Sequence, residues 1–442
     1  MGASVAHYPP VQQHSAAVVS SKAYIIGGLR HYPSKKDELY PWSSIFCVDF
    51  KSKSFEMPSS VISEPLPSSF AAGCASVDET IYLYGGETKT GASESELSDQ
   101  LFGLNVTTMA WFTVESGGSQ PVARTGHAMC SVGNQLVLFG GYGLEPPPGI
   151  LAEGSRWKPR RGARGWSSEL ATLQVHPLPG NWFRPKCIGA WPAERACHTM
   201  TTVGENKVAL FGGWNESGTL NDLHILSIAN EWTWSRVRGA SDDPKLPFVF
   251  NHTATYLNPE PEFHLLLLLG GMEGSNNKES KFKQNCYLID VQTGLTTQLS
   301  DCQVARAGHS SSCVTNPDGT AVIYVHGGIG ESGGSVNKSL VFWWSPGCFT
   351  TLKRLSSLEE IPSLAFEERH RLESASFRAT VLQKLVRKRD SLTSQERPNS
   401  SRQQKTTFPL SIAPDSASHA SGSVASSETP RSNDHDEEED YF

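Results

Sequence analysis

The chain lacks the features that mark membrane and secreted proteins. The longest apolar run among its 442 residues is the short stretch at residues 265 to 269, ahead of a glycine pair. A membrane-spanning helix needs about 20 such residues. The first ten residues, MGASVAHYPP, contain neither a basic nor an apolar segment and therefore predict no secretory signal. We expect no membrane partner.

Positive charge is scarce as well. The chain has 38 lysines and arginines against 45 aspartates and glutamates, which gives a formal net charge of −7. Six of the carboxylates lie in the last ten residues, NDHDEEEDYF, so the rest of the chain is close to neutral. Binding to nucleic acid depends largely on basic residues that displace counterions from phosphates. The composition therefore argues against a nucleic-acid partner.

Motifs for disulfide frameworks, metal binding and catalysis are also missing. The nine cysteines are scattered and form no C-x-x-C pair, as is typical of reduced intracellular thiols. The chain contains no G-x-S-x-G, H-E-x-x-H or P-loop sequence, and no loop brings two metal-ligand side chains together at metal-binding spacing. We expect a cytoplasmic or nuclear protein that is not an enzyme and has no cofactor, metal or catalytic residue.

What the chain does contain is a repeat. Six apolar runs each end in a glycine pair, as in VALFGG. The first glycines of these pairs are Gly27, Gly85, Gly140, Gly212, Gly270 and Gly327. Their successive spacings are 58, 55, 72, 58 and 57 residues, and a period of this length indicates an array of repeats.

Each unit has further parts in a constant order. A head segment precedes the glycine pair, and in five units it carries a histidine: His14, His127, His198, His252 and His309. In the second unit Gly73 takes this place. A variable loop, an alternating strand and a closing aromatic follow the pair, which predicts four short strands per unit. Because one such sheet cannot bury its face alone, we expect six sheets stacked around an axis.

The glycine pairs have a structural explanation. Near a crowded axis a strand must turn beside another backbone, and glycine permits both a positive φ and a close approach. A phosphate cradle would instead need a glycine-rich loop that opens a helix. The head histidines recur once per unit, so we expect them to bind backbone between neighbouring sheets and not a metal.

The order of head histidine, Gly-Gly, Asp-Leu and closing tryptophan resembles the kelch repeat and covers residues 10 to 355. The resemblance implies an all-β, six-bladed kelch β-propeller that serves as a platform for protein binding. One alternative is a scaffold or adaptor with no link to a ubiquitin ligase. Another is a metal-dependent kelch enzyme.

The third unit departs from the period because of an insertion at residues 142 to 170. It is rich in proline and glycine and carries two tryptophans among several basic residues. Arginine binds carboxylates in bidentate fashion and tryptophan offers a flat wall, so this loop could receive an acidic or carboxylate-ended peptide. A solvated, mobile insertion is the alternative reading.

Within kelch proteins, the chain resembles the substrate receptors of cullin-2 ubiquitin ligases, which bind the free C-terminus of a target. The shared stretches are LVLFGGYG, a long insertion ending RGW, and NDLHIL. The resemblance implies ligand-binding roles for Tyr142 and Trp166. It fails at Trp214 and Thr219, where the family has arginines, and at residues 250 and 251, where it has Ser-Trp.

Without the two arginines of the family, other residues of this chain would have to bind the ligand. A charge-assisted hydrogen bond is worth about 1.5 to 3 kcal/mol, so binding of a chain terminus would require compensation by Arg160, Arg161 or Arg164. Trp214 is a candidate aromatic anchor, because tryptophan is enriched at binding hot spots. Its alternative role is packing at the base of a loop.

The chain changes character beyond the repeats. Residues 356 to 392 lose glycine, gain charge and carry a helical apolar stripe, which predicts a helical extension. The run at residues 351 to 359 is similar to the box with which cullin-2 receptors dock the elongin adaptor. That resemblance implies adaptor contacts for Leu352, Leu355 and Leu358, although the helix could instead fold back on the flank of the propeller. Residues 393 to 442 predict a disordered acidic tail.

Overall fold

The computed structural model describes residues 10–30, 38–61, 66–89, 95–161, 163–238, 246–258, 264–275, 278–317, 320–336, 339–344 and 353–355. All of these belong to one compact unit, Met1–Val386. The described residues form strands and connecting segments and contain no helix. No helix in this part of the chain is therefore long and apolar enough to cross a membrane. The expected helical extension and acidic tail, residues 356 to 442, lie outside the described residues.

Six antiparallel sheets make up the body of this unit. The first contains β1 (Ser15–Val19), β2 (Lys22–Ile26), β5 (Ile45–Asp49) and β6 (Ser54–Glu56). The second contains β7 (Gly73–Val77), β8 (Thr80–Tyr84), β11 (Leu101–Asn105) and β12 (Ala110–Thr113). The third contains β15 (Ala128–Val132), β16 (Gln135–Phe139), β20 (Leu170–Gln174) and β21 (Gly180–Phe183).

The other three sheets repeat this order of strands. The fourth contains β23 (Thr199–Thr202), β24 (Lys207–Phe211), β27 (Leu223–Ser227) and β28 (Trp232–Val237). The fifth contains β29 (Thr253–Leu257), β30 (Leu265–Leu269), β33 (Asn285–Asp290) and β34 (Thr296–Gln303). The sixth contains β35 (Arg306–Thr315), β36 (Ala321–Gly330), β37 (Leu340–Trp344) and β38 (Lys353–Leu355). Two short strands, β13 (Ser116–Gly118) and β22 (Cys187–Gly189), add in parallel to the outer edges of the third and fourth sheets.

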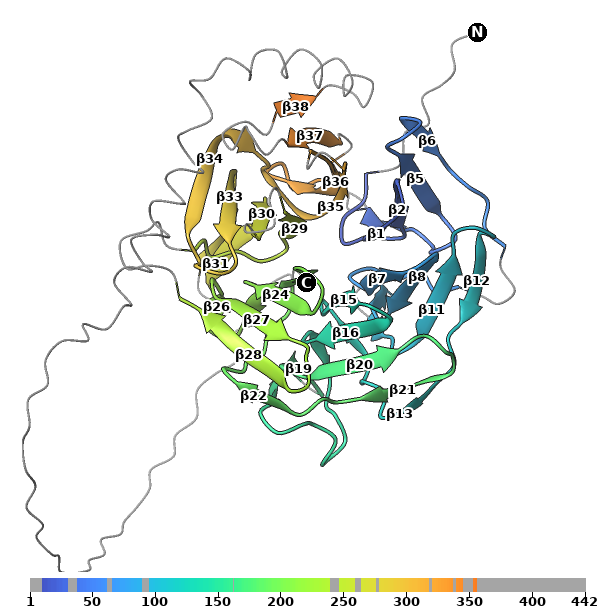
Figure 1. The fold of residues 1–442 in the computed structure, drawn as a ribbon, viewed down its shortest axis with the longest axis vertical. Coiled ribbons are helices and arrows are strands. Elements are labelled where there is room, and N and C mark those ends of the chain that lie inside the picture. Colours follow the sequence, from blue (N-terminus) through green and yellow to red (C-terminus); the bar gives the residue numbers. More distant parts are fainter. Residues whose placement is uncertain are drawn as a thin grey trace, which may run out of the picture. The chain divides into compact units, whose positions relative to one another are not determined.

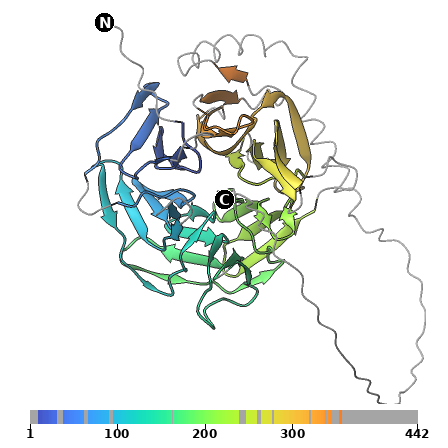
Figure 2. The ribbon, with the colours of Figure 1, turned by 180° about the vertical axis from the view of Figure 1, so that it is seen from behind.

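The sheets stand around a common axis, with their first strands innermost (Figure 1). Each innermost strand contacts the innermost strand of the next sheet, and β35 of the sixth sheet contacts β1 of the first. Seen from behind, the same ring is evident (Figure 2). The prediction of an all-β kelch-type propeller is confirmed.

The ring closes through a circle of backbone hydrogen bonds at the axis. The residue directly before each head position donates its N–H to the carbonyl of its counterpart in the neighbouring sheet, over 2.7 to 3.0 Å. The six residues are Gln13, Ala71, Gly126, Cys197, Asn251 and Gly308. All six have a left-handed backbone, with φ between 51° and 62°. The last bond of the circle runs from Gln13 to Gly308 and joins the first sheet to the sixth.

The glycine pairs lie just outside this circle, between successive head residues. A Cβ on the first glycine of a pair would meet the head histidine of the next sheet, and one on the second would meet the head residue of its own sheet. At Gly212, for example, the added Cβ would lie 3.1 Å from His252, and at Gly213 it would lie 2.8 Å from the Cβ of His198. The structural explanation of the pairs is confirmed.

The second sheet departs from this arrangement in a revealing way. Its head position is occupied by Ala72 and not, as expected, by Gly73. The evidence is that a Cβ on Gly86, the second glycine of the pair, would meet the Cβ of Ala72, as the other second glycines meet their head histidines. The space of the absent histidine is filled by Trp42, which is 1 % exposed and would meet a Cβ on Gly27 at 2.7 Å. Its indole N–H donates to the carbonyl of Ser69.

The head histidines bind mostly hydroxyl groups, which corrects the expectation of backbone partners. Nε2 of His14 lies 2.7 Å from the hydroxyl of Ser310, and His252 and His309 contact Thr199 and Thr253 in the same manner. Each hydroxyl belongs to the residue after the head of the neighbouring sheet. At His127 the equivalent partner is a backbone group, since His127 accepts a hydrogen bond from the N–H of Gly73, a residue without a hydroxyl.

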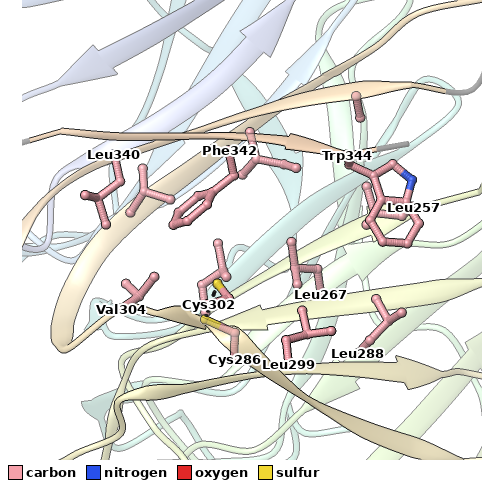
Figure 3. Close-up of a cluster of buried hydrophobic side chains, with 14 of the residues drawn as sticks. Leu257, Leu267, Cys286, Leu288, Leu299, Cys302, Val304, Leu340, Phe342 and Trp344 are labelled. Carbon is pink, nitrogen blue, oxygen red and sulfur yellow. Dashed lines mark hydrogen bonds between the residues drawn. The ribbon is translucent and has the colours of Figure 1, made fainter. Parts of the chain in front are cut away.

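The core consists of six apolar clusters, each formed between two neighbouring sheets. The cluster between the fifth and sixth sheets is drawn in Figure 3, where Leu267 and Leu288 of one sheet face Phe342 and Trp344 of the other. Each sheet therefore buries both faces only because it has two neighbours, so the ring must be closed for all six sheets to be fully packed.

We predict that a side chain at a glycine pair lowers stability for two separable reasons, the close approach of neighbouring atoms and the left-handed backbone. Gly327→Ala places a Cβ 2.1 Å from the carbonyl of Val11, and should lower stability by about 2 to 4 kcal/mol. Gly133→Ala is the matched control, because Gly133 has a φ of +54° and open space around it. It should cost only about 1 kcal/mol. Thermal or urea unfolding of both variants measures the difference, and equal losses would contradict the crowding argument.

The head histidines also predict acid sensitivity. Burial lowers the pKa of His14 to about 4 and the pKa values of His127 and His252 to about 3. It also lowers the pKa of His198 well below its usual value. The unfolded chain takes up protons near pH 6.5, whereas the folded chain does not, so stability is present at neutral pH and is lost as pH falls below about 6.5.

When the pH falls from 7.5 to 5.5, each of these histidines should lower the free energy of unfolding by about 1.4 kcal/mol. His198→Gln should reduce the fall in thermal midpoint over this range, because it removes one buried titrating group. The exposed His176, whose side chain is 42 % accessible, supplies the control His176→Gln. The same pH dependence in both variants would show that the buried histidines do not cause the acid loss.

Candidate binding surface on the crown of the ring

Every glycine pair is followed by a hairpin on one face of the ring, and we call these hairpins the crown. They are β3 (Leu29–Arg30) with β4 (Glu38–Leu39), β9 (Glu87–Lys89) with β10 (Ser95–Leu97), β25 (Trp214–Asn215) with β26 (Gly218–Thr219), and β31 (Met272–Ser275) with β32 (Lys278–Phe282). The sixth is the end of β36, where Ile329 bridges to Ser335. Because each hairpin follows the second strand of its sheet, all of them extend from the same face.

The third crown element is the insertion, which supplies three strands of a four-stranded sheet: β17 (Tyr142–Leu144), β18 (Trp157–Arg161) and β19 (Arg164–Ser167). The fourth strand is β14 (Arg124–Thr125), from the head segment of the third repeat. Tyr142 and Trp166 are direct partners across β17 and β19, with ring centroids 5.8 Å apart. Both are buried, at 8 % and 2 % exposure. The insertion thus contributes to a sheet packed on two aromatic side chains.

Three ion pairs fix this sheet to its neighbours. Arg164 binds Glu87 at 3.2 Å and donates to the carbonyl of Ser95 at 2.6 Å, both on the crown hairpin of the second sheet. Lys158 binds Glu216 on the turn of the fourth hairpin, and Glu194 at 3.9 Å. Two of the five basic side chains of the insertion are therefore paired with carboxylates of neighbouring segments.

Arg160 has a different environment. Its guanidinium lies 5.0 Å from the ring centroid of Trp166, in a cation–π contact, while the side chain remains exposed. The indole N–H of Trp166 has no hydrogen-bond partner among the described residues. A buried donor of this kind gains from an acceptor supplied by a ligand or a water molecule. The side chain of Arg161 lies outside the described residues.

The positions that differ from the cullin-2 receptors meet one another in the crown. Trp214 is half-buried, and its ring centroid lies 5.1 Å from that of Phe250. The backbone of Phe250 pairs with Met272 of the fifth hairpin, whose side chain is also half-buried. The result is an apolar patch of Trp214, Phe250 and Met272. Sequence reasoning selected Trp214 and noted Phe250 only as a departure, and it missed Met272.

The remaining departures have structural partners. The hydroxyl of Thr219 donates to the carbonyl of Gly274 at 2.8 Å and accepts from its N–H at 2.9 Å, which ties the fourth hairpin to the fifth. Asn251 belongs to the circle of backbone hydrogen bonds at the axis. Neither residue replaces the charge of an arginine. The part of the crown around the apolar patch therefore lacks the two arginines with which the cullin-2 receptors would bind a carboxylate.

Buried ion pairs support the base of the crown. Arg195 is fully buried and binds both carboxylate oxygens of Asp222, which also accepts from His224 at 3.0 Å. Burial alone would raise the pKa of Asp222, but the hydrogen bonds from Arg195 and His224 outweigh it and hold the pKa well below its usual range. Arg124 and Glu169 form the equivalent pair in the third sheet. These groups satisfy one another and hold the glycine carbonyls, so we assign them to the scaffold.

Two other predictions concern metals and the adaptor segment. Among the described residues, no group of three or more histidine, cysteine, aspartate or glutamate side chains could hold a metal ion. Leu355 ends β38, where its backbone pairs with Val341 at the outer edge of the sixth sheet. Leu352 and Leu358 lie outside the described residues. Their proposed role in binding the adaptor therefore stays a prediction.

Comparison with known proteins agrees with this architecture. Residues 13–153 match the model of the KLHDC2/KLHL20/DRC7 kelch-repeats domain. The bovine (Bos taurus) Kelch domain-containing protein 2 is 29% identical over 184 residues, which cover 39% of this chain and 42% of the relative. The human (Homo sapiens) Kelch domain-containing protein 1 is 28% identical over 277 residues, covering 60% of this chain and 63% of the relative.

The matched stretches thus span less than two thirds of the length of these relatives. Among solved structures, that of YjhT superimposes with a TM-score of 0.55 at 15% identity and covers 76% of this chain and 96% of its own. At that identity the likeness concerns the fold alone. The family match thus concerns the kelch repeats within residues 13–153, and the solved structure concerns the ring of sheets.

Proposed function

We propose, on the premise that this chain is a kelch-repeat β-propeller protein, that it binds a segment of a partner protein on the crown between the third and fifth sheets. Kelch propellers and the Kelch domain-containing relatives support an interaction module in general. The choice of this part of the crown rests on one observation, the contact of the half-buried Trp214 with Phe250 beside the folded insertion.

The chemistry of the surface supports this choice. A half-buried tryptophan on a rigid hairpin offers a large apolar contact at low cost in conformational entropy, which is typical of binding hot spots. Lys158 and Glu216 bring the insertion against the turn that follows Trp214, so the apolar patch and the exposed Arg160 belong to adjacent crown elements. We expect a ligand segment that places an apolar side chain on Trp214 and a carbonyl or acidic group near Arg160 and Trp166.

A finer proposal is that the chain delivers its ligand to a cullin-2 type ubiquitin ligase. It is supported by the resemblance of residues 351 to 359 to the adaptor box and by the likeness to Kelch domain-containing protein 2. Under this proposal Leu352, Leu355 and Leu358 bind the elongin adaptor, and the protein acts in the cytoplasm or nucleus. If the ligase link fails, the interaction platform remains as the function.

We predict that Trp214→Ala in the full chain lowers recovery of the bound partner by about tenfold or more, as expected of a hot-spot residue. The measurement is quantitative mass spectrometry after affinity capture with wild-type and variant baits. Ile188→Ala is the matched control, because Ile188 is 45 % exposed but lies on the outer edge of the fourth sheet. Loss of the partner with the control, or its retention with both Trp214→Ala and Arg160→Ala, would contradict binding at this surface.

For the ligase proposal, purified full chain, elongin adaptor and cullin-2 should elute together in gel filtration. Replacement of both Leu352 and Leu358 by alanine should abolish the shared peak, while thermal unfolding stays unchanged because these residues flank the last described strand. Separate elution of the wild-type chain and the adaptor would exclude the ligase role. That result would leave the Trp214 experiment untouched.

A further inference from the structure

Two cysteines meet in the apolar core between the fifth and sixth sheets. Cys286 lies on β33 and Cys302 near the end of β34. Their sulfur atoms are 2.7 Å apart, with the Cys302 thiol pointing at that of Cys286 (Figure 3). Both side chains are fully buried, at 0 % and 1 % exposure. In the part of the chain that the structure describes, this is the only contact between two thiols.

A break in the strand register creates this contact. Cys286 pairs with Leu299, yet the preceding residue Asn285 pairs with Gln303. Residues 300 to 302 therefore form a bulge in β34 with no partners in β33. A regular ladder would place residue 300 opposite Asn285, whereas the bulge returns the side chain of Cys302 to the face that carries Cys286.

The surroundings of the pair explain why it is inert in the closed structure. The two sulfurs lie among Leu299, Val304 and Leu340 in the cluster between the fifth and sixth sheets. The hydrogen bond with Cys302 and burial both raise the pKa of the Cys286 thiol, so little thiolate is present at neutral pH. Since the thiolate is the reactive form, oxidation requires the bulged end of β34 to open.

We propose that Cys286 and Cys302 are a modification site that forms a reversible intramolecular disulfide. The co-reactant is a small disulfide such as oxidised glutathione. After β34 opens, one cysteine loses its proton and attacks the small disulfide, which releases one small thiol and leaves a mixed disulfide. The second cysteine loses its proton and attacks the protein sulfur of that bond. The products are one protein disulfide and two small thiols, so two protein thiols are oxidised and one small disulfide is reduced.

The bond would join two strands at a structurally important point. Val304, two residues after the bulge, donates its N–H to the carbonyl of Gln284, and the carbonyl of Arg306 accepts from the N–H of Gly271. The disulfide would therefore hold the chain where it passes from the fifth sheet into the head of the sixth. By closing a loop of 16 residues, it restricts the unfolded chain and stabilises the folded one.

The test uses the full chain incubated with a series of ratios of oxidised to reduced glutathione, followed by alkylation of remaining thiols under denaturing conditions. We expect peptide mapping to find a disulfide between the Cys286 and Cys302 peptides, with a higher thermal midpoint that returns to its starting value after reduction. Cys286→Ser and Cys302→Ser should each abolish that linked peptide. Cys130→Ser, which changes a buried cysteine of the third sheet, should leave it unchanged.

The outcome in the wild-type chain decides the proposal even if a serine variant folds poorly. Full alkylation of both cysteines after exposure to the most oxidising mixture would overturn it. Glutathione adducts without the intramolecular bond, or bonds that join either residue to a different cysteine, would also overturn it. None of these results depends on the ligand proposed for the crown.

Discussion

The circle of backbone hydrogen bonds at the axis is the constraint on which the other parts of the structure depend. Six residues, one from each repeat, adopt a left-handed backbone and pass a hydrogen bond from sheet to sheet until Gln13 reaches Gly308. In the described part of the chain no strand is shared between two of the six sheets, so this circle, the bonds from Gly328 to Val11 and between His14 and Ser310, and the apolar clusters hold the first sheet to the sixth. The N-terminal head is therefore as important to the ring as any strand.

Packing around this circle sets the repeat motif. With the heads so close to the axis, the glycine pair must pass between two consecutive head residues, and any side chain there would meet the backbone or a histidine. His14, His252 and His309 in turn bind the hydroxyl of the residue that follows the head of the preceding sheet. Where the second repeat has Ala72, Trp42 fills the vacant volume. The glycine pair and the head residue of each repeat are thus required by contacts between neighbouring sheets and not by contacts within one sheet.

The crown shows how a constant ring supports a variable surface. Arg164 and Lys158 join the insertion to hairpins on both sides, so even the longest loop is part of a continuous layer. Aromatic residues then concentrate where Trp214 and Phe250 meet. A propeller can change its ligand by changing such loop residues, because they contribute little to the circle, the glycine layer or the clusters.

The sequence by itself determined the class of fold, the repeats and the role of the glycine pairs, because period, strand patterning and backbone freedom are properties of short stretches of chain. It also pointed to Trp214 as an unusual residue. Only the tertiary structure decided what Trp214 contacts, that the partners of most head histidines are hydroxyls, and that Arg164 and Lys158 are bound within the crown. Those facts depend on which distant residues the ring brings together, and no local pattern encodes the distance between two loops of neighbouring sheets.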